Sequence, residues 1–333
     1  MHARYAPMFA ALNINSEPDR HKAVAYFRGM AQNLIDCHYN LSFTDTLLAD
    51  SAINPSELRR KNVAPSIPYD FFMDSIRSHY LGAYYRGDTF YLTTSITTGL
   101  LDSFKVGVIT GLINNNILYF HLNTFYLQAV LNQRNPYWLG ASWNWFLSKL
   151  HNQQATAKGI IIDMRSNNGG MISDLDFIAG QIVGQPTHFA DTRGKSGNGR
   201  LDYSPWIPAM ATPPAGATGV GVPIIVLTDR HSVSMAEMTT MALRSLPNTI
   251  VLGDTTWGAN GPLDPYDQLY GGGQFFFAGY GFVYTSSAEY RYHNGKIYEG
   301  KGFPPDIYVP VNTDSLAAGI DVQLEAAIKL LDQ

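Results

Sequence analysis

Two short aliphatic runs, residues 159–164 and 222–228, constrain the fold of this chain more than any other feature. Runs of this length and composition are typical of strands that are buried on both faces of a sheet. Each run is followed by a polar turn and then by the apolar spacing of a helix. Because repeated strand–turn–helix order is typical of parallel sheets covered by helices, these runs predict an α/β fold.

The rest of the chain continues this alternation. Apolar periodicity, with breaks at Gly, Pro and Asn, predicts where the elements begin and end. Besides the two aliphatic runs and a helix after Gly170, we expect strands over 89–96, 104–109, 117–122, 249–253 and 305–311, and helices over 19–38, 69–80, 138–151, 234–246 and 320–331. Because residues 187–221 are rich in Gly, Pro and Ser, we expect a long ordered loop or lid there.

The composition excludes several classes of protein. A chain with 45% hydrophobic and 15% charged residues is not intrinsically disordered. The net charge of -4 offers no basic surface for phosphates, so we expect no nucleic-acid partner. The single cysteine, Cys37, allows no internal disulfide and no cysteine-based zinc site, and the nine scattered histidines form no helical ligand pair. We therefore expect no metal and no cofactor.

Two long uncharged runs, 106–133 and 203–228, do not predict membrane spans. The first contains three consecutive asparagines and the second contains five prolines, which would break a spanning helix. The first residues of the chain lack a basic start followed by an apolar stretch, so we expect no signal peptide.

Ser234 stands at the start of the helix that follows the 222–228 strand. A serine there can expose its hydroxyl, while the unpaired N–H groups and positive dipole end of the helix face any negative charge beside it. This geometry suits an acyl nucleophile. The alternative is that Ser232 or Ser234 only caps the helix, with Glu237 completing a capping box, and this segment taken alone favours capping.

A glycine pair, Gly169 and Gly170, follows the strand over 159–164. Glycine allows a positive φ and close backbone approach, so either N–H group could complete an oxyanion hole with the N–H of Met235. The alternative is an ordinary turn, which is common after strands in α/β proteins.

Together the two segments resemble the tail-specific, or C-terminal processing, serine peptidase family. Residues 163–170 match its Asp-x-Arg-x-Asn-x-Gly-Gly strand, and residues 232–237 match its Ser-x-Ser-x-x-Glu helix. The resemblance extends through 251–258, 300–307 and 321–328. It implies that Ser234 is the nucleophile and that the core is a spiral, ClpP/crotonase-like arrangement of strand–helix units.

One position separates two branches of this family. Where the dyad branch has a lysine, this chain has Ala259, which excludes a Ser/Lys dyad. The other branch, which includes the tricorn core protease and the interphotoreceptor retinoid-binding protein, has an upstream motif like Leu-x-Asp-Gly-His-Thr. Residues 34–39 resemble this motif, with Cys37 and Tyr39 replacing the usual Gly and Thr. The resemblance implies that His38 is the general base.

The resemblance also implies that Glu299 orients His38, because the branch has a glutamate seven residues before the aspartate that corresponds to Asp306. A neutral imidazole can take a proton from a serine, and a carboxylate fixes its tautomer and stabilises the imidazolium. Outside the resemblance, His38 is interpreted as a satisfied histidine at a helix end and Glu299 as a solvated loop acid.

We therefore expect a serine-type endopeptidase that cleaves peptide or protein substrates through an acyl-enzyme on Ser234. Residues 1–80 should form a helical N-terminal segment that carries His38, and residues 81–333 should form the α/β catalytic domain. Between His38 and the strand over 117–122 there are too few residues for the PDZ insertion found in many relatives. Family habit implies an extracytoplasmic location, periplasmic or secreted, and the sequence leaves the oligomeric state open.

Two other functions fit the same residues. A non-catalytic module that binds an apolar ligand or a peptide is compatible with the aromatic content of 13%. An esterase or other acyl hydrolase would need the same nucleophile and oxyanion hole. The presence of Ser234, His38 and Glu299 together favours an enzyme over a binding module.

Overall fold

The two aliphatic runs of the sequence form neighbouring parallel strands, β5 (Gly159–Asp163) and β8 (Ile224–Thr228). Every residue of both strands is buried, as expected for strands covered on both faces. The structure, a computed structural model, describes residues 2–13, 15–56, 63, 65–84, 86–95, 101–133, 137–152, 156–199, 201–263, 272–277 and 281–333.

The chain divides into two units, each assembled from separate stretches of sequence. Unit 1 comprises residues 1–63, 192–207 and 261–290, and unit 2 comprises residues 64–191, 208–260 and 291–333. These divisions differ from the boundary expected at residue 80, which stays a prediction about domains. The difference arises because the N-terminal segment pairs a strand with residues from the last quarter of the chain.

Unit 2 is built on a sheet that has seven strands within the described residues, in the order β13-β9-β8-β5-β4-β3-β2. Strands β4, β5, β8, β9 and β13 run parallel to one another. Strand β3 is antiparallel to both of its neighbours, β2 and β4. The α/β prediction is confirmed. The strands not yet given are β2 (Arg86–Ser95), β3 (Leu101–Ile113), β4 (Ile117–Leu122), β9 (Thr249–Gly253) and β13 (Ile307–Tyr308).

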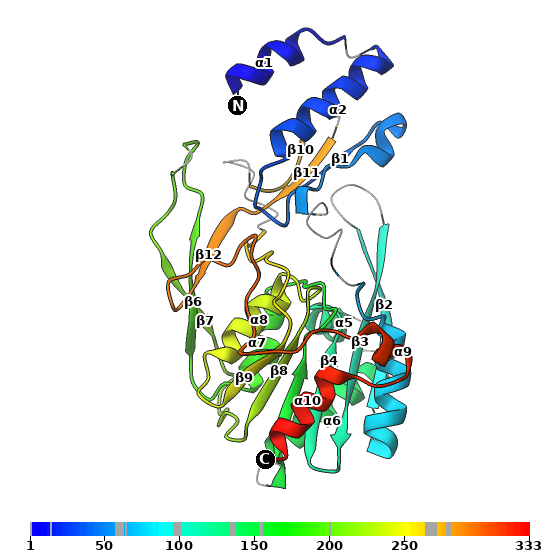
Figure 1. Cartoon of the computed structure of the whole chain (residues 1–333). Helices are drawn as coiled ribbons and strands as arrows, with labels where there is room; N and C mark the ends of the chain where they lie inside the picture. The colour runs from blue at the N-terminus through cyan, green and yellow to red at the C-terminus, as the bar shows by residue number, and fades with distance from the viewer. Residues whose placement is uncertain are drawn as a thin grey trace. The chain divides into compact units, whose positions relative to one another are not determined.

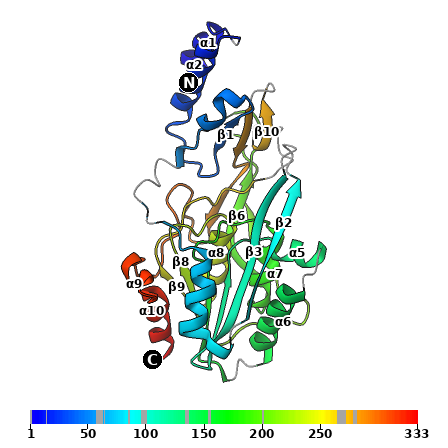
Figure 2. The same ribbon diagram turned by 90° about the vertical axis from the view of Figure 1, so that its right-hand side faces the viewer.

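Helices cover both faces of this sheet (Figures 1 and 2). The helices of unit 2 are α4 (Tyr69–Phe71), η2 (Phe72–Leu81), η3 (Gly82–Tyr84), α5 (Leu127–Gln133), α6 (Tyr137–Asn152), α7 (Ser173–Ile178), η5 (Ala179–Gln181), α8 (Met235–Arg244), α9 (Thr313–Ala317) and α10 (Val322–Leu331). On one face, η2 and α10 pack in a cluster with Ile161 of β5 and Ile225 of β8. On the other, Trp143 and Phe146 of α6 contact Phe120 of β4.

Unit 1 combines helices with a small antiparallel sheet. Its elements are α1 (His2–Ala10), α2 (Glu17–Ala31), β1 (Asn40–Phe43), η1 (Thr46–Ser51), β10 (Gly273–Phe277) and β11 (Gly281–Thr285). The strand order is β1-β11-β10. Val24 of α2, Leu41 of β1 and Val283 of β11 share one buried cluster, so the helix and the sheet have a common core. Neither α1 nor this sheet was expected from the sequence.

Residues 187–221, expected to be a long loop or lid, form two strands instead. β6 (Thr187–Gly194) lies between β7 (Ile207–Ala211) and β12 (Ala288–Tyr292) in a three-stranded sheet, and each strand has residues in both units. Most of the Gly, Pro and Ser residues that suggested a loop lie outside the two strands. Within β6, by contrast, Phe189 and Ala190 are fully buried. The prediction of a lid was wrong.

The other expected helices and strands are present, but the strand expected over 305–311 is only the short β13, and residue 96 of the strand expected over 89–96 lies outside the described residues. One boundary matters for function. The helix expected over 19–38 is α2, which ends at Ala31. Asp36 accepts the backbone N–H of His38 at 2.9 Å, and such side-chain bonds compete with helical hydrogen bonding. His38 therefore lies in a turn between α2 and β1.

The two uncharged runs, 106–133 and 203–228, contain strands, turns and a short helix. Among the helices within the described ranges, none is both long and apolar enough to span a bilayer.

A buried arginine, Arg165, joins the end of β5 to the start of α10. Its guanidinium makes five hydrogen bonds of 2.6–3.1 Å, to Asp163, Asp321 and Gln323. Asp321 is also the N-cap of α10 and accepts the backbone N–H of Leu324 at 3.0 Å. Because the charges are paired and hydrogen bonded, the cluster can remain ionised inside the core.

Replacing Arg165 should destabilise the protein strongly. Arg165→Met leaves the carboxylates of Asp163 and Asp321 buried without a counter-charge, a change that typically costs about 3–5 kcal/mol. Lys158→Met is the matched control, because it removes a largely exposed ion pair with Asp332, at the end of α10, worth about 0–1 kcal/mol. Urea unfolding measures both, and equal losses for the two variants would contradict the role given to Arg165.

Candidate active site

Ser234 connects β8 to α8 in a backbone conformation that is unusual for a residue with a side chain. Its φ is 56° and its ψ is -114°. Non-glycine residues in sparsely populated regions cost about 1–3 kcal/mol each and persist only where the surroundings hold them. Ser234 is the N-cap of α8, and the capping box expected with Glu237 is present.

The turn before Ser234 is fixed by Ser232 and Asp229. The buried hydroxyl of Ser232 donates to the carbonyl of Met164 at 2.8 Å and accepts the N–H of Asp229 at 3.0 Å. The carboxylate of Asp229 accepts the N–H of Ser166 at 3.0 Å, which links this turn to the residues after β5. Ser232 is therefore engaged in the fold, whereas Ser234 is only half-buried.

Glu237, on the first turn of α8, is a fully buried carboxylate that binds two segments. It accepts the N–H of Ser234 at 3.1 Å, the N–H groups of Gly258 and Ala259 at 2.7 Å each, and the hydroxyl of Thr256. Burial raises the pKa of Glu237, and these four hydrogen bonds oppose that shift. The carboxylate thus holds Ser234 and the turn after β9 together.

The first glycine of the pair, Gly169, packs directly against Ser234. A Cβ atom at Gly169 would lie 2.6 Å from Cβ of Ser234, 2.9 Å from the carbonyl oxygen of Val233 and 3.1 Å from the nitrogen of Met235. Gly169 also has a φ of 85°, in the left-handed region that favours glycine. Close approach and backbone conformation therefore both require glycine here.

The three candidate oxyanion donors are not equivalent. The N–H of Gly169 donates to Oδ1 of Asn167 at 2.8 Å, so it is already engaged. Within the described residues, neither Gly170 N–H nor Met235 N–H donates a hydrogen bond. Met235 is the first residue of α8, where N–H groups have no partner inside the helix. The structure thus leaves Gly170 and Met235 as the donors that an oxyanion could use.

Glu299 lies in unit 2, beside the turn that follows β9. Its Oε2 accepts the backbone N–H of Asn260 at 2.6 Å. Asn260 follows Ala259, whose own N–H donates to Glu237, so consecutive residues of one turn bind the two glutamates. At the position where the dyad branch has a lysine, the methyl group of Ala259 is fully buried.

His38 lies in unit 1. Burial lowers the pKa of its imidazole to about 4, while the charge of Asp36 and a hydrogen bond to the backbone of Gly261 oppose the shift. Its buried Nδ1 has no hydrogen-bond partner among the residues that the structure describes. The imidazole is therefore neutral at neutral pH, which is the form that can accept a proton.

The six predicted site residues fall in both units. Unit 1 holds His38, and unit 2 holds Ser234, Met235, Gly169, Gly170 and Glu299. The supporting roles of Asp229, Thr256 and Asn260 were not predicted from the sequence. Each of them lies close to a motif, but its partner is distant in sequence, so no local pattern could have identified it.

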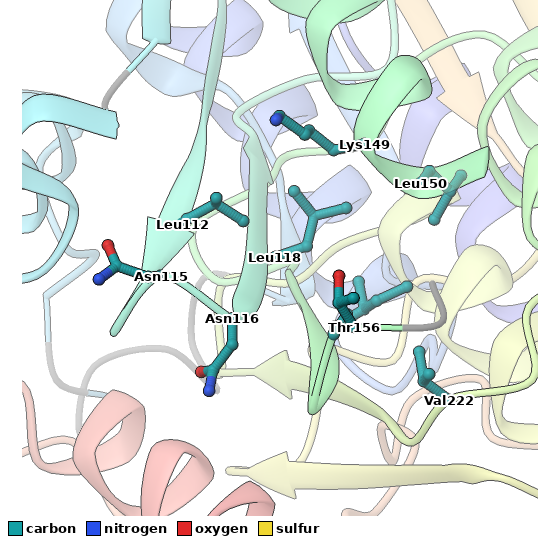
Figure 3. Close-up of a pocket in the computed structure, with 10 residues that line it drawn as sticks. Leu112, Asn115, Asn116, Leu118, Lys149, Leu150, Thr156 and Val222 are labelled. Atoms are coloured by element: carbon teal, nitrogen blue, oxygen red, sulfur yellow. The ribbon is translucent and has the colours of Figure 1, made fainter. Parts of the chain in front are cut away.

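A separate pocket lies at the opposite end of the parallel strands (Figure 3). Its lining includes Leu112, Leu118, Lys149 and Val222. Val222 precedes β8 whereas Ser234 follows it, so the pocket lies at the amino ends of the strands and the serine at the carboxyl ends. Open α/β sheets bind ligands at the carboxyl ends, and none of the ten lining residues belongs to the predicted site.

Comparison with known protein families shows which family the chain belongs to. Residues 116–309, more than half of the chain, match Peptidase family S41. The chain belongs to peptidase family S41. The matched range contains Ser234, Glu237 and Glu299, whereas His38 precedes it. S41 is a family of serine peptidases.

Two solved structures are similar to this S41 chain. A putative peptidase from Parabacteroides merdae ATCC 43184 is 20% identical with a TM-score of 0.67, covering 98% of this chain and 87% of that chain. Mature CPAF, solved in complex with lactacystin, is 14% identical with a TM-score of 0.54, covering 80% of this chain and 60% of that chain. The fold is the mixed α/β fold of S41 peptidases, with a ClpP/crotonase-like core. The absence of a PDZ insertion stays a prediction.

A third relative was identified by sequence. The tricorn protease of Thermoplasma volcanium is 23% identical to this S41 chain over 178 residues. The match covers 54% of this chain but 15% of that protein. The chain thus spans only a small part of the length of this relative.

Gly169→Ala should destabilise the protein more than a matched glycine substitution. Gly216 has nearly the same φ, 83° against 85°, but a Cβ there meets nothing within 4 Å. Gly216→Ala therefore adds only backbone strain, of the order of 1–2 kcal/mol, whereas Gly169→Ala adds overpacking of about 1–3 kcal/mol against the start of α8. Chemical unfolding of both variants measures the difference, and equal destabilisation would contradict the packing described here.

Proposed function

We propose that this S41 peptidase is an endopeptidase in which Ser234 attacks the carbonyl carbon of a peptide bond and His38 is the general base. One observation carries the proposal. Ser234 is held with a positive φ at the start of α8, next to Met235 and packed against Gly169, and the N–H groups of Met235 and Gly170 donate to no described residue. This combination suits a nucleophile next to a site where negative charge develops.

In the first half of the proposed reaction, the hydroxyl oxygen of Ser234 bonds to the substrate carbonyl carbon while its proton passes to His38. The carbonyl oxygen becomes an oxyanion that accepts hydrogen bonds from Met235 and Gly170. The tetrahedral intermediate then expels the amine, which takes the proton from His38, and the acyl group remains on Ser234.

In the second half, water replaces the amine. His38 accepts a proton from the attacking water, and the same two N–H groups bind the second oxyanion. Collapse of that intermediate breaks the ester bond, returns the proton to Ser234 and releases the carboxylic acid. No group other than water is consumed, and the enzyme returns to its starting state.

We further propose that Glu299 orients His38. In unit 1, His38 hydrogen bonds to the backbone of Gly261, and in unit 2, Glu299 accepts the N–H of Asn260. The buried methyl group of Ala259 provides no amine as an alternative base.

Hydrolysis of a matched peptide and ester should depend on Ser234 and His38. Ser234→Ala and His38→Ala should each lower kcat/KM by about a thousandfold or more, as loss of a nucleophile or base does in other triads. Ser245→Ala, at the other end of α8, and His21→Ala, exposed on α2, should retain wild-type activity. Hydrolysis of the ester alone would indicate an acyl hydrolase, and no turnover of either substrate by folded wild type would indicate a binding module.

The pH profile of kcat/KM tests His38 separately. Since burial lowers the pKa of His38 to about 4, the rate should stay constant below neutral pH and fall only near pH 4. Stability changes over the same range, because the unfolded imidazole, with a pKa of about 6.5, binds a proton that the folded one does not. This stabilisation is present above about pH 6.5 and is lost as the pH falls toward 4, so thermal unfolding must be measured at each pH. Half-maximal activity near pH 6.5 in folded protein would contradict the burial of His38.

A further inference from the structure

The carboxylate of Asp36 is bound more extensively than a turn requires. Its Oδ1 accepts the backbone N–H of His38 at 2.9 Å, which is a common local bond between an aspartate and the residue two positions on. Three further donors come from the end of β11, far away in sequence. Thr285 Oγ1 donates at 2.7 Å, and Ser286 donates through both its N–H and its hydroxyl at 2.9 Å.

These bonds close a ring of contacts around His38 within unit 1. The Ser286 hydroxyl, which donates to Asp36, also lies 3.3 Å from the carbonyl oxygen of Gly261. Gly261 in turn is hydrogen bonded to the imidazole of His38. A Cβ at Gly261 would lie 2.3 Å from Oγ of Ser286, so the contact is close. His38 is thus held through its main chain by Asp36 and through its ring by Gly261, with Ser286 between them.

The charge of Asp36 acts on the imidazole as well. Burial lowers the pKa of His38, and Asp36 is the largest influence that raises it. Other titratable groups beside this turn in unit 1 are the buried thiol of Cys37 and two tyrosines. The ring of Tyr284 lies edge-on to His38 at 6.2 Å, and burial and the charge of Asp36 both raise the pKa of Tyr39.

We propose that Asp36 is a positioning residue for the general base: it fixes the His38 turn against the end of β11. The inference rests on the proposed role of His38. Asp36 itself touches neither the substrate nor Ser234 in this scheme. It acts through the main chain of His38, through the contact chain that reaches Gly261, and through its charge.

The experiment compares the rate at which a fluorophosphonate probe labels Ser234 in wild type, Asp36→Asn and Thr285→Val. Asparagine keeps one acceptor oxygen but loses the charge and presents an amide to the N–H of Ser286. Since misplacement by about 1 Å can cost 100-fold in rate, labelling of Asp36→Asn should be about 10-fold to 100-fold slower. Thr285→Val removes one of the four hydrogen bonds and keeps the charge, so its loss should be smaller.

Asp45→Asn is the matched control in the same unit. Asp45 caps η1 and pairs with Arg20 at 2.6 Å, and asparagine can still cap, so its labelling rate should equal that of wild type. The NMR titration of His38 gives a readout that a purely structural role would not move. Its midpoint should shift to lower pH in Asp36→Asn and stay unchanged in Thr285→Val and Asp45→Asn.

A wild-type labelling rate in folded Asp36→Asn would overturn the inference, and so would slow labelling with an unchanged His38 titration, since Asp36 would then serve the fold alone. If Asp36→Asn does not fold, the Thr285→Val variant tests the inference instead. Slower labelling of Thr285→Val at an unchanged unfolding midpoint supports the inference, and a wild-type labelling rate overturns it. If wild type itself is not labelled, the proposed function fails, and the His38 titration still tests the link to Asp36.

Discussion

The carboxylate of Glu237 accepts hydrogen bonds from two segments of the chain, and the geometry around Ser234 depends on it. A buried carboxylate is costly unless its oxygens are hydrogen bonded. Here the donors are the N–H groups of Ser234, Gly258 and Ala259 and the hydroxyl of Thr256. The same bonds that make burial of the charge tolerable also fix Ser234 in a conformation that it would not adopt alone. The hydrogen bonds that Glu237 accepts therefore determine the geometry of the site.

Buried or partly buried carboxylates that accept several hydrogen bonds occur at two other places in the protein. Asp163 and Asp321 are satisfied by Arg165 in the core of unit 2, and Asp36 is satisfied by donors from the end of β11 in unit 1. Asp321 and Asp36 each bind groups that are far away in sequence. Such bonds define the relative positions of two segments more narrowly than apolar packing does, because they depend on direction as well as distance. A site that must hold its groups within a fraction of an ångström benefits from this property.

The sequence predicted those features that depend on short-range patterns. The aliphatic runs at β5 and β8 and the capping box of Ser234 and Glu237 each lie within a few consecutive residues, and all were found. The pairing of β1 with β11 was not predicted, because Leu41 and Val283 come together from opposite ends of the chain. The bond from Thr285 to Asp36 spans 249 positions, and no periodicity reports such a contact.

In one segment, residues 187–221, composition predicted the wrong structure, again because strand pairing joins residues that are distant in sequence. The Gly, Pro and Ser residues of 187–221 correctly indicate turns. They do not indicate β6 and β7, because these strands are stabilised by pairing with each other and, for β6, with β12. The site residues were predicted from motifs, and the structure adds which donors are engaged. The N–H of Gly169 is bound to Asn167, whereas the N–H of Gly170 donates to no described residue, a distinction that no sequence pattern contains.

The dependence of Ser234 on Glu237 can be tested by a crystal structure of the Glu237→Gln variant. A glutamine amide cannot accept both N–H groups of the turn after β9 and the N–H of Ser234. The account predicts that Ser234 leaves its φ of 56° for a negative value and that the turn carrying Gly258 and Ala259 moves away from α8. Retention of the positive φ at Ser234, with the turn still in place, would contradict it.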